Sequence, residues 1–447
     1  MSDVLRDAAE RAIRYLDSLD ERRVGPDPEA VERLRELETP LPEGPSDPEA
    51  TIALLDQHSG ALMAMSGPRF FGFVIGGTLP AALAANWMAG AWDQNAAYFV
   101  SSPLCEKVED VALSWLVDLL GLPTGTGAGF VTGATVANFT CLAAARKSVL
   151  QAAGWDVEAD GLFGAPPVTV VIGEEAHPSL MKALGMLGFG RNRLVRVAVD
   201  DQGRMRADAF PEHIQAPAIV CLQAGNVNTG AFDPAEAIIP RAKAAGAWVH
   251  VDAAFGLWAA ATPRYAHLMA GYADADSWAT DAHKYLNTPY DSGLAFVRDA
   301  EMLRGAMAVT AAYLPTSTLR DACSYTPELS RRARGVEVWA ALHSLGRTGV
   351  AELVERTCRH AQHFAEGLRA AGFDVLNEVV LNQVLVSFGD ATQTERVIAS
   401  IQREGVLWAG VTRWQGHTAM RISVSGWRTT DADVERSLAA IVRAARE

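Results

Sequence analysis

The sequence predicts an α/β protein built on a mostly parallel central sheet, followed by a smaller domain of mixed α and β structure. Short runs rich in β-branched residues alternate with helix-length, alanine-rich segments in the middle of the chain. Such alternation is typical of a parallel sheet covered by helices on both faces. With 447 residues, 49% of them hydrophobic and 21% charged, the chain can bury a large core in two or three domains.

Residues 1–60 predict a helical arm. MSDVLRDAAERAIRYLDSLDERRV alternates charged and apolar residues at helical spacing, and a Pro-rich passage and a second helix follow. The first segment lacks the continuous apolar stretch of a signal peptide, so we expect an amphipathic helix there. Because the arm has little core of its own, we expect it to pack on a partner subunit.

Residues 61–310 are expected to form the large α/β domain. Its strand candidates are VTVVIGEE (168–175), RLVRVAVD (193–200), AIVCLQAG (218–225), WVHVDAA (248–254) and SGLAFVRD (292–299). Residues 311–447 are expected to form a small α+β domain. It is helical at first and then carries the strand candidates NQVLVSFG (382–389) and HTAMRISVSG (417–426).

Charge and cysteine content argue against several classes of partner. The formal net charge of -14 and pI near 5.2 disfavour nucleic acid and anionic membranes, which attract basic surfaces. The five cysteines are widely spaced, without a CxxC pair or a zinc-ligand cluster, so we expect reduced thiols, no metal and a cytoplasmic location. The apolar stretch at 79–91 is too short to span a bilayer.

Two motifs place charged side chains beside predicted strands. HVDAAF (250–255) is an apolar strand that ends in Asp252, at the edge where an α/β sheet binds ligands. From this motif alone, a helix cap or an ion pair remains an open alternative for Asp252. Lys284 lies in the polar segment SWATDAHKYLNTPYDSGLAFV (277–297), although most lysines are simply solvated at the surface.

Two further motifs open predicted helices. GTGAGFVTGATVANFTCLAAAR (125–146) starts with a glycine-rich turn whose backbone N–H groups and helix dipole favour an anion such as phosphate. It is not a dinucleotide fingerprint, because Phe130 occupies the third glycine position, and no Walker lysine follows. A turn that only permits close packing remains open. In EEAHPSLMKA (174–183), His177 follows a β-run and begins a helix.

One cofactor, pyridoxal phosphate (PLP), requires all four features together. Its aldehyde needs an amine, its phosphate needs an anion cradle, its pyridine nitrogen needs a carboxylate, and its flat ring needs a stacking partner. The combination therefore indicates a PLP-dependent enzyme.

The motifs resemble the group II PLP-dependent decarboxylases, the family of the aromatic L-amino-acid, histidine and glutamate decarboxylases, which have the fold type I architecture. The resemblance also covers RFFGFVIGGTLPAALAANWMAGAWDQN (69–95), SSPLCEKVEDVALSWLVDLLGLP (101–123), QAGNVNTGAFD (223–233) and ELSRRARGVEVWAALHSLG (328–346). HVDAA followed by HK about thirty residues later is the most specific part.

The resemblance implies a role for each motif residue. Lys284 is expected to bind PLP as a Schiff base, Asp252 to pair with the pyridine nitrogen, and His177 to stack on the ring. Further residues are expected to bind the cofactor or to lie beside it or the substrate: Gly133, Ala134, Thr135, Ala254, Asn226, Asn228, Asp281 and His283.

The resemblance implies decarboxylation of an L-amino acid to its amine and CO2, with an aromatic substrate slightly favoured. Around Phe73, Val74 and Ile75 the chain departs from the aromatic decarboxylases, which carry larger aromatic residues there. A mobile loop is expected at 312–328, where the family uses a tyrosine to protonate the substrate carbon. Ala322 or Ser324 aligns near that position, so we expect Tyr325, or else Tyr313, to be the donor.

Other outcomes remain open. The same site serves an aldehyde synthase or a carbon–carbon lyase, and a non-catalytic relative would keep the fold. Because the family forms its sites at a dimer interface, the resemblance also implies a homodimer with shared active sites.

Overall fold

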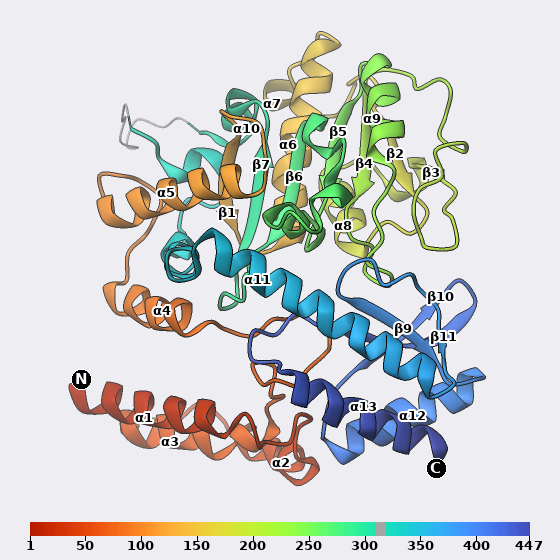
Figure 1. Ribbon diagram of the computed structural model, residues 1–447. Helices are drawn as coiled ribbons and strands as arrows, with labels where there is room; N and C mark the ends of the chain where they lie inside the picture. The colour runs from red at the N-terminus through yellow and green to blue at the C-terminus, as the bar shows by residue number, and fades with distance from the viewer. Residues whose placement is uncertain (310–318) are drawn as a thin grey trace.

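The computed structural model describes residues 1–309 and 319–447, and its centre is a seven-stranded sheet (Figure 1). The strand order is β1-β7-β6-β5-β4-β2-β3. Strand β7 is antiparallel to both of its neighbours, and β2 to β6 pair in parallel. The strands are β1 (Gly127–Val131), β2 (Thr169–Gly173), β3 (Val195–Val197), β4 (Ala218–Gln223), β5 (Trp248–Asp252), β6 (Ser277–Asp281) and β7 (Gly293–Val297). The predicted mostly parallel sheet is confirmed.

All five strand candidates of the large domain are strands, but the prediction of a turn from residue 125 onward is wrong for β1. Glycine is depleted in strands, so GAGFV does not read as one. A Cβ at Gly127 would lie 2.7 Å from Cα of Ala300, and one at Gly129 would lie 2.7 Å from Thr326 Cγ2. Glycine is therefore required here because α10 and the chain near Thr326 approach β1 closely.

Helices cover both faces of the large sheet. On one face lie α6 (Ala134–Ala152), α8 (Pro178–Met186) and α10 (Ala300–Met307), and on the other α5 (Pro103–Leu119), α9 (Ala235–Ala244) and α11 (Arg334–Ala370). On strand β2, Val170 and Ile172 pack into the core on the α6 face of the sheet, and Val171 packs into the core on the α5 face. This alternation follows from the two-residue period of a strand.

The C-terminal region has its own sheet, as predicted. Strands β8 (Asp374–Val375), β9 (Gln383–Ser387), β10 (Gly410–Trp414) and β11 (His417–Ser423) pair antiparallel in the order β10-β11-β9-β8. Helices α12 (Ala391–Glu404) and α13 (Asp431–Arg446) pack on it with the C-terminal half of α11. Helix α11 is kinked at Gly346, whose φ is 61°.

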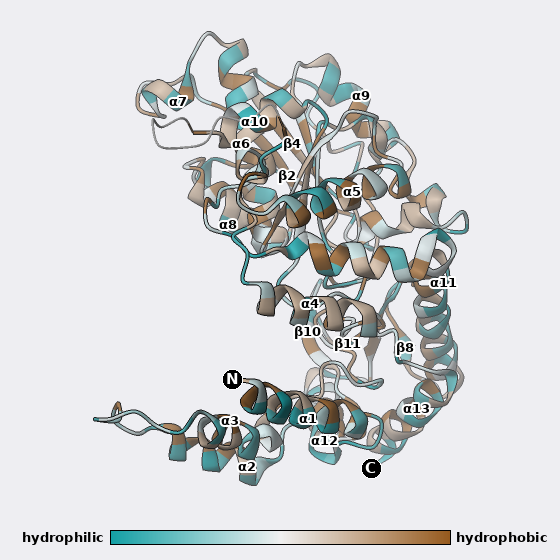
Figure 2. Cartoon of the chain, turned by 90° about the vertical axis from the view of Figure 1, so that its left-hand side faces the viewer, coloured by the Kyte–Doolittle hydropathy of each residue, from teal (hydrophilic) through white to brown (hydrophobic). Residues whose placement is uncertain are grey.

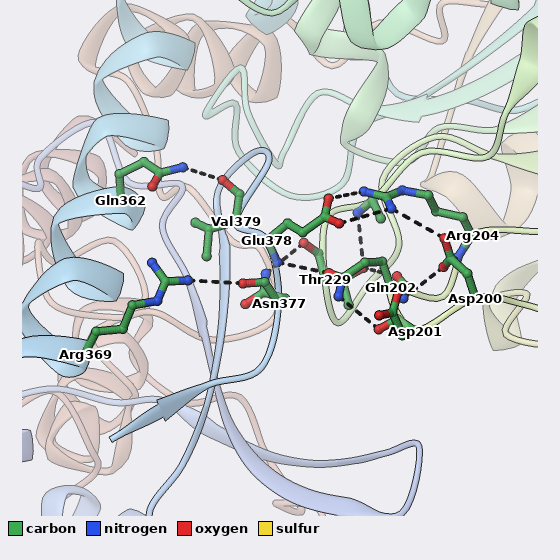
Figure 3. A network of polar contacts seen from close by, with 11 residues as sticks. Asp200, Asp201, Gln202, Arg204, Thr229, Gln362, Arg369, Asn377, Glu378 and Val379 are labelled. Carbon is green, nitrogen blue, oxygen red and sulfur yellow. Dashed lines mark hydrogen bonds and ion pairs between the residues drawn. The ribbon is translucent and has the colours of Figure 1, made fainter. Parts of the chain in front are cut away.

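Polar contacts join the small sheet region to the loops of the large sheet (Figure 3). Asn377 donates to the Thr229 carbonyl at 3.0 Å, and the Glu378 N–H donates to Gln202 at 2.9 Å. Arg204 forms an ion pair with Glu378 at the same junction. The loop after β4 is thereby fixed against the C-terminal region.

The N-terminal helices lie apart from the large sheet (Figure 2). They are α1 (Ser2–Ser18), α2 (Pro28–Arg33) and α3 (Pro48–Gln57), and α4 (Pro80–Trp92) follows them beside α11. The arm exposes large apolar side chains, among them Leu5 at 61% and Leu55 at 62%. Across residues 1–309 and 319–447, we find no helix of the length and apolarity that crossing a membrane requires.

Candidate active site

Three predicted site residues lie at the carboxyl ends of strands in the large sheet. Asp252 is the last residue of β5, Lys284 follows β6, and His177 is the N-cap of α8 after β2. Parallel strands present these ends at one edge, where α/β proteins bind ligands. The fold therefore brings the three side chains to one place.

Lys284 is held by a carboxylate and an aromatic ring. Its Nζ lies 3.0 Å from Asp281 Oδ2 and 5.9 Å from the centre of the Phe255 ring. The Lys284 side chain is 17% exposed, so most of it is packed against the protein and a small part remains accessible to solvent. An accessible amine of this kind suits attachment to an aldehyde carbon.

Asp252 is a buried carboxylate without a complete set of partners. The residue is 3% exposed, and among the described residues its Oδ2 has no hydrogen-bond partner. Burial raises its pKa, and electrostatic interactions with the neighbouring His177 and Lys284 oppose this rise. A buried acceptor without a hydrogen bond is costly, so this carboxylate is well suited to accept a donor from a ligand. A protonated pyridine nitrogen is such a donor.

The start of α6 forms the predicted cradle, with Gly133 as N-cap. The Ala134 N–H donates to Asp281 Oδ1 at 2.7 Å, so a carboxylate already occupies one of the free donors of this helix end. Thr135 makes no hydrogen bond through its side chain within the described chain and remains available to a phosphate. A Cβ at Gly293 would collide with the Gly133 backbone, so glycine on β7 lets the cradle approach the sheet.

His177 is fixed in one ring orientation by its own helix. Its Nδ1 accepts the Ser179 backbone N–H at 3.2 Å and lies 2.7 Å from Ser179 Oγ, which leaves the ring proton on Nε2. Burial lowers the pKa of His177, and the nearby Asp252 opposes this effect. The ring is therefore a neutral, flat surface next to Asp252, which suits stacking on an aromatic cofactor.

These groups fit PLP: an amine, an anion cradle, an unpartnered carboxylate and a flat ring at one sheet edge. Residues 42–389 match the family described as "Pyridoxal-dependent decarboxylase conserved domain". The chain belongs to the pyridoxal-dependent decarboxylase family. It is a carboxy-lyase that uses PLP.

Known decarboxylases resemble most of the chain. Tryptophan decarboxylase 1 of Oryza sativa subsp. japonica is 29% identical over 374 residues, which cover 76% of this chain and 71% of that protein. The aromatic-L-amino-acid decarboxylase of Bacillus atrophaeus is 23% identical over 432 residues, with 91% and 87% covered. The structure of the Oryza sativa enzyme TDC with PLP and tryptamine has the same fold, with a TM-score of 0.92 at 22% identity, covering 100% of this chain and 98% of that one.

His283 and Ala254 of this decarboxylase surround Asp281. His283 Nε2 lies 3.6 Å from Asp281 Oδ2, and its ring stacks on Tyr290 with centres 4.3 Å apart. Burial lowers the pKa of His283. The carbonyl of Ala254 accepts the Asp281 N–H at 3.0 Å. Both residues therefore position the carboxylate that holds Lys284.

Asn226 and Asn228 lie in the loop after β4. Asn226 Oδ1 accepts the Asn228 N–H at 2.8 Å, and its Nδ2 donates to Gln223 at 3.2 Å and to Glu175 at 3.3 Å. The Asn228 side chain accepts from Thr412 at 2.8 Å. These contacts shape the loop and tie it to the small sheet.

Of the two predicted proton donors, Tyr325 lies among the described residues. Part of the predicted mobile loop, including Tyr313, lies outside the described residues. Ala322, Ser324 and Tyr325 belong to a short 3-10 helix, and the Tyr325 ring packs under the Arg320 guanidinium, 4.7 Å from its carbon. Among its described contacts, Tyr325 has none with Lys284 or Asp252 of the same chain.

Sequence analysis did not find Arg421. This residue of β11 lies between the buried Met420 and Ile422, and its guanidinium has one long hydrogen bond, to the Val227 carbonyl at 3.4 Å. Burial lowers the pKa of Arg421, and its charge contributes to the lowered pKa of His177. A single arginine in an apolar strand, far along the chain from the motifs, carries no local signal of such a position.

Proposed function

We propose that this carboxy-lyase converts an L-aromatic amino acid into its amine and CO2. The observation that carries the proposal is a stack of three aromatic rings. The centres of Phe73 and Trp408 are 5.2 Å apart, as are those of Trp408 and Phe70. Aromatic surfaces favour aromatic ligands through offset stacking. The aromatic amino acid decarboxylases among the relatives support the same substrate class.

The segment that carries Phe73 borders the lysine turn. A Cβ at Gly76 would collide with the carbonyl oxygen of Lys284. Phe73 and Val74 have φ values of 55° and 61°, in the left-handed region that L-residues with large side chains avoid. Strain of this kind clusters at ligand sites, and Phe73 keeps 56% of its surface exposed and available to a substrate ring.

Each residue of the site is proposed to have its own role in the reaction. When bound, PLP supplies a protonated ring that accepts the electron pair left on Cα as the Cα–carboxylate bond breaks and CO2 leaves. Asp252, ionised, would hold the proton on the pyridine nitrogen, and Lys284 would bind the aldehyde carbon. The neutral His177 ring would stack on the cofactor. Arg421, a half-buried cation without an ion-pair partner among the described residues, would orient the substrate carboxylate.

A proton must then reach Cα to give the amine. We assign Tyr325 as the donor, acting in the active site of a second subunit, and its packing away from Lys284 of its own chain supports this arrangement. If no donor reaches Cα, dioxygen accepts the electron pair and is reduced to peroxide. Water then releases the substrate carbon as an aldehyde and its nitrogen as ammonia, after the loss of CO2. That reaction, an aldehyde synthase, is the second candidate.

A homodimer follows from the same arrangement. The apolar side chains exposed on the arm support an interface with a second copy, because an arm of this kind can bury them only against another surface. Leu5, Leu54, Leu55 and Leu62 are exposed between 45% and 62%.

The substrate proposal is tested by kcat/KM for a panel of aromatic, acidic and aliphatic L-amino acids with the wild type and with Phe73→Ala. We expect aromatic substrates to be preferred and Phe73→Ala to reduce kcat/KM for them by about tenfold, which corresponds to loss of one stacking contact. Preference for an acidic substrate would contradict the proposal.

A further inference from the structure

A row of buried polar side chains runs behind Asp252, inside the core between the large sheet and α6. Trp248 and His250 come from β5, Ser277 from β6 and Asn138 from α6. His250, Ser277 and Asn138 are 0% exposed, and Trp248 is 7% exposed. Buried polar groups in an apolar core are unfavourable unless each finds a partner, so their placement requires a reason.

The contacts form a continuous chain. Trp248 Nε1 donates to Ser277 Oγ at 2.9 Å, and Ser277 Oγ lies 2.9 Å from His250 Nδ1. On the other side of the ring, His250 Nε2 lies 2.8 Å from Asn138 Oδ1. Each residue in the row therefore contacts the next.

The direction of these bonds follows from their chemistry. An indole nitrogen only donates, so the Ser277 oxygen accepts from Trp248 and its own hydroxyl proton is free to point at His250 Nδ1. Burial lowers the pKa of His250 to about 3, so the ring is neutral and carries its one proton on Nε2. That proton meets the carbonyl oxygen of Asn138, which only accepts.

Fixing the Asn138 oxygen also fixes its amide nitrogen. Among the described residues, Asn138 Nδ2 and Asp252 Oδ2 are both buried atoms without a hydrogen bond of ordinary geometry. Asp252 follows His250 by two residues on β5, so both side chains project from the same face of the sheet, and the Asn138 side chain that contacts His250 lies on that face. Hydrogen bonding by Asn138 opposes the rise of the Asp252 pKa through burial. A donor and an acceptor, each without another partner, thus lie beside each other.

We propose that Asn138 is a positioning residue, which the row Trp248–Ser277–His250 orients so that its amide donates to Asp252 and keeps this carboxylate ionised for the pyridine nitrogen of PLP. The inference rests on PLP as the cofactor. An aspartate buried in this core tends to take up a proton, and a protonated Asp252 cannot hold the ring nitrogen in its charged form. The row acts on Asp252, not on the substrate.

The test compares two cofactors in the same variants. One is PLP, and the other is the analogue in which a C–H group replaces the ring nitrogen, so that Asp252 has no N–H to accept. Holoenzyme is prepared with each, and the cofactor retained after serial dilution is measured by its absorbance. The variants are Asn138→Leu, which keeps the size but removes the amide, and the control Asn382→Leu, which removes a buried amide of the small sheet region.

We expect Asn138→Leu to weaken binding of PLP by about tenfold, as for loss of one hydrogen bond to a charged group, and to leave binding of the analogue unchanged. Asn382→Leu should change both affinities equally or neither. Equal weakening of both cofactors by Asn138→Leu would show a purely structural role and overturn the inference, as would no change with PLP.

Two further results keep the test decisive. If Asn138→Leu does not fold, Ser277→Ala interrupts the same row two contacts away from Asn138. This variant should weaken the binding of PLP but not of the analogue, and by less than Asn138→Leu would. Equal effects of Ser277→Ala on both cofactors would overturn the inference. If the wild type binds PLP and the analogue equally, Asp252 does not pair with the ring nitrogen. That result contradicts the proposed role of Asp252, and it is distinct from a result that contradicts only the role of Asn138.

Discussion

Asp281 connects Lys284 to the start of α6. Its Oδ2 lies 3.0 Å from Lys284 Nζ, and its Oδ1 accepts the Ala134 N–H at 2.7 Å. One carboxylate therefore holds both the amine proposed to anchor PLP and the helix end expected to bind the phosphate.

Asp281→Ala should destabilise the protein more without the cofactor than with it. The change leaves the buried Ala134 N–H without an acceptor, which costs about 1–3 kcal/mol in the free energy of unfolding. Bound phosphate can accept this N–H and restore part of the loss. The measurement is the unfolding midpoint of apoenzyme and holoenzyme, with the exposed Asp274→Ala as control. An equal or larger loss in the holoenzyme would contradict the role of Ala134 in the cradle.

Glu106 should make the protein less stable as the pH rises. It is 2% exposed on α5, and burial, with repulsion from Glu109, raises its pKa from the ordinary 4.5 to about 7. Between these values the folded protein keeps a proton that the unfolded chain has lost, so stability falls across this window and the deficit is complete above pH 7. The full effect is at most about 3 kcal/mol.

Glu106→Gln should remove this dependence. The variant should unfold at a higher temperature than the wild type at pH 8, and the difference should shrink toward pH 5. The exposed Glu366→Gln serves as control and should follow the wild type. A difference between Glu106→Gln and wild type that is constant with pH would mean that Glu106 does not titrate in this window.

Arg421→Met should impair substrate binding while the cofactor stays bound. Methionine fills a similar volume but cannot pair with a carboxylate, so KM for the amino acid should rise by about tenfold or more. The visible absorbance of the bound cofactor should be retained. Arg413, exposed on neighbouring β10, provides the control Arg413→Met. An unchanged KM in Arg421→Met would remove this residue from the substrate site.

Leu55→Asp should weaken the homodimer. Leu55 on α3 is 62% exposed, and a charge placed in an apolar interface is strongly unfavourable. Sedimentation at micromolar concentration should show monomer for this variant and dimer for the wild type. Phe163 is 99% exposed beyond the arm, and Phe163→Asp should remain dimeric. If Leu55→Asp stays dimeric, the interface does not use this face of the arm.

The sequence predicts regular, locally encoded features well and long-range ones poorly. Strands β4 and β5 are apolar runs bounded by clear turns, so their pattern predicts them. Strand β1 is not predicted from the sequence, because its Gly127 is required by close packing against α10, which lies far along the chain. Lys284, Asp252 and His177 are found through motifs that encode their position at strand ends. Arg421 and Asn138 depend on tertiary partners, and nothing in their local pattern marks them.

The most direct test of the proposed function is the product balance with L-tryptophan, L-tyrosine and L-phenylalanine as substrates of the PLP-loaded enzyme. We expect one amine for each CO2 released from at least one of them, activity lost in Lys284→Ala, and activity kept in Lys182→Ala, which changes an exposed lysine. No CO2 from any of the three, or an aldehyde with peroxide in place of the amine, would contradict it.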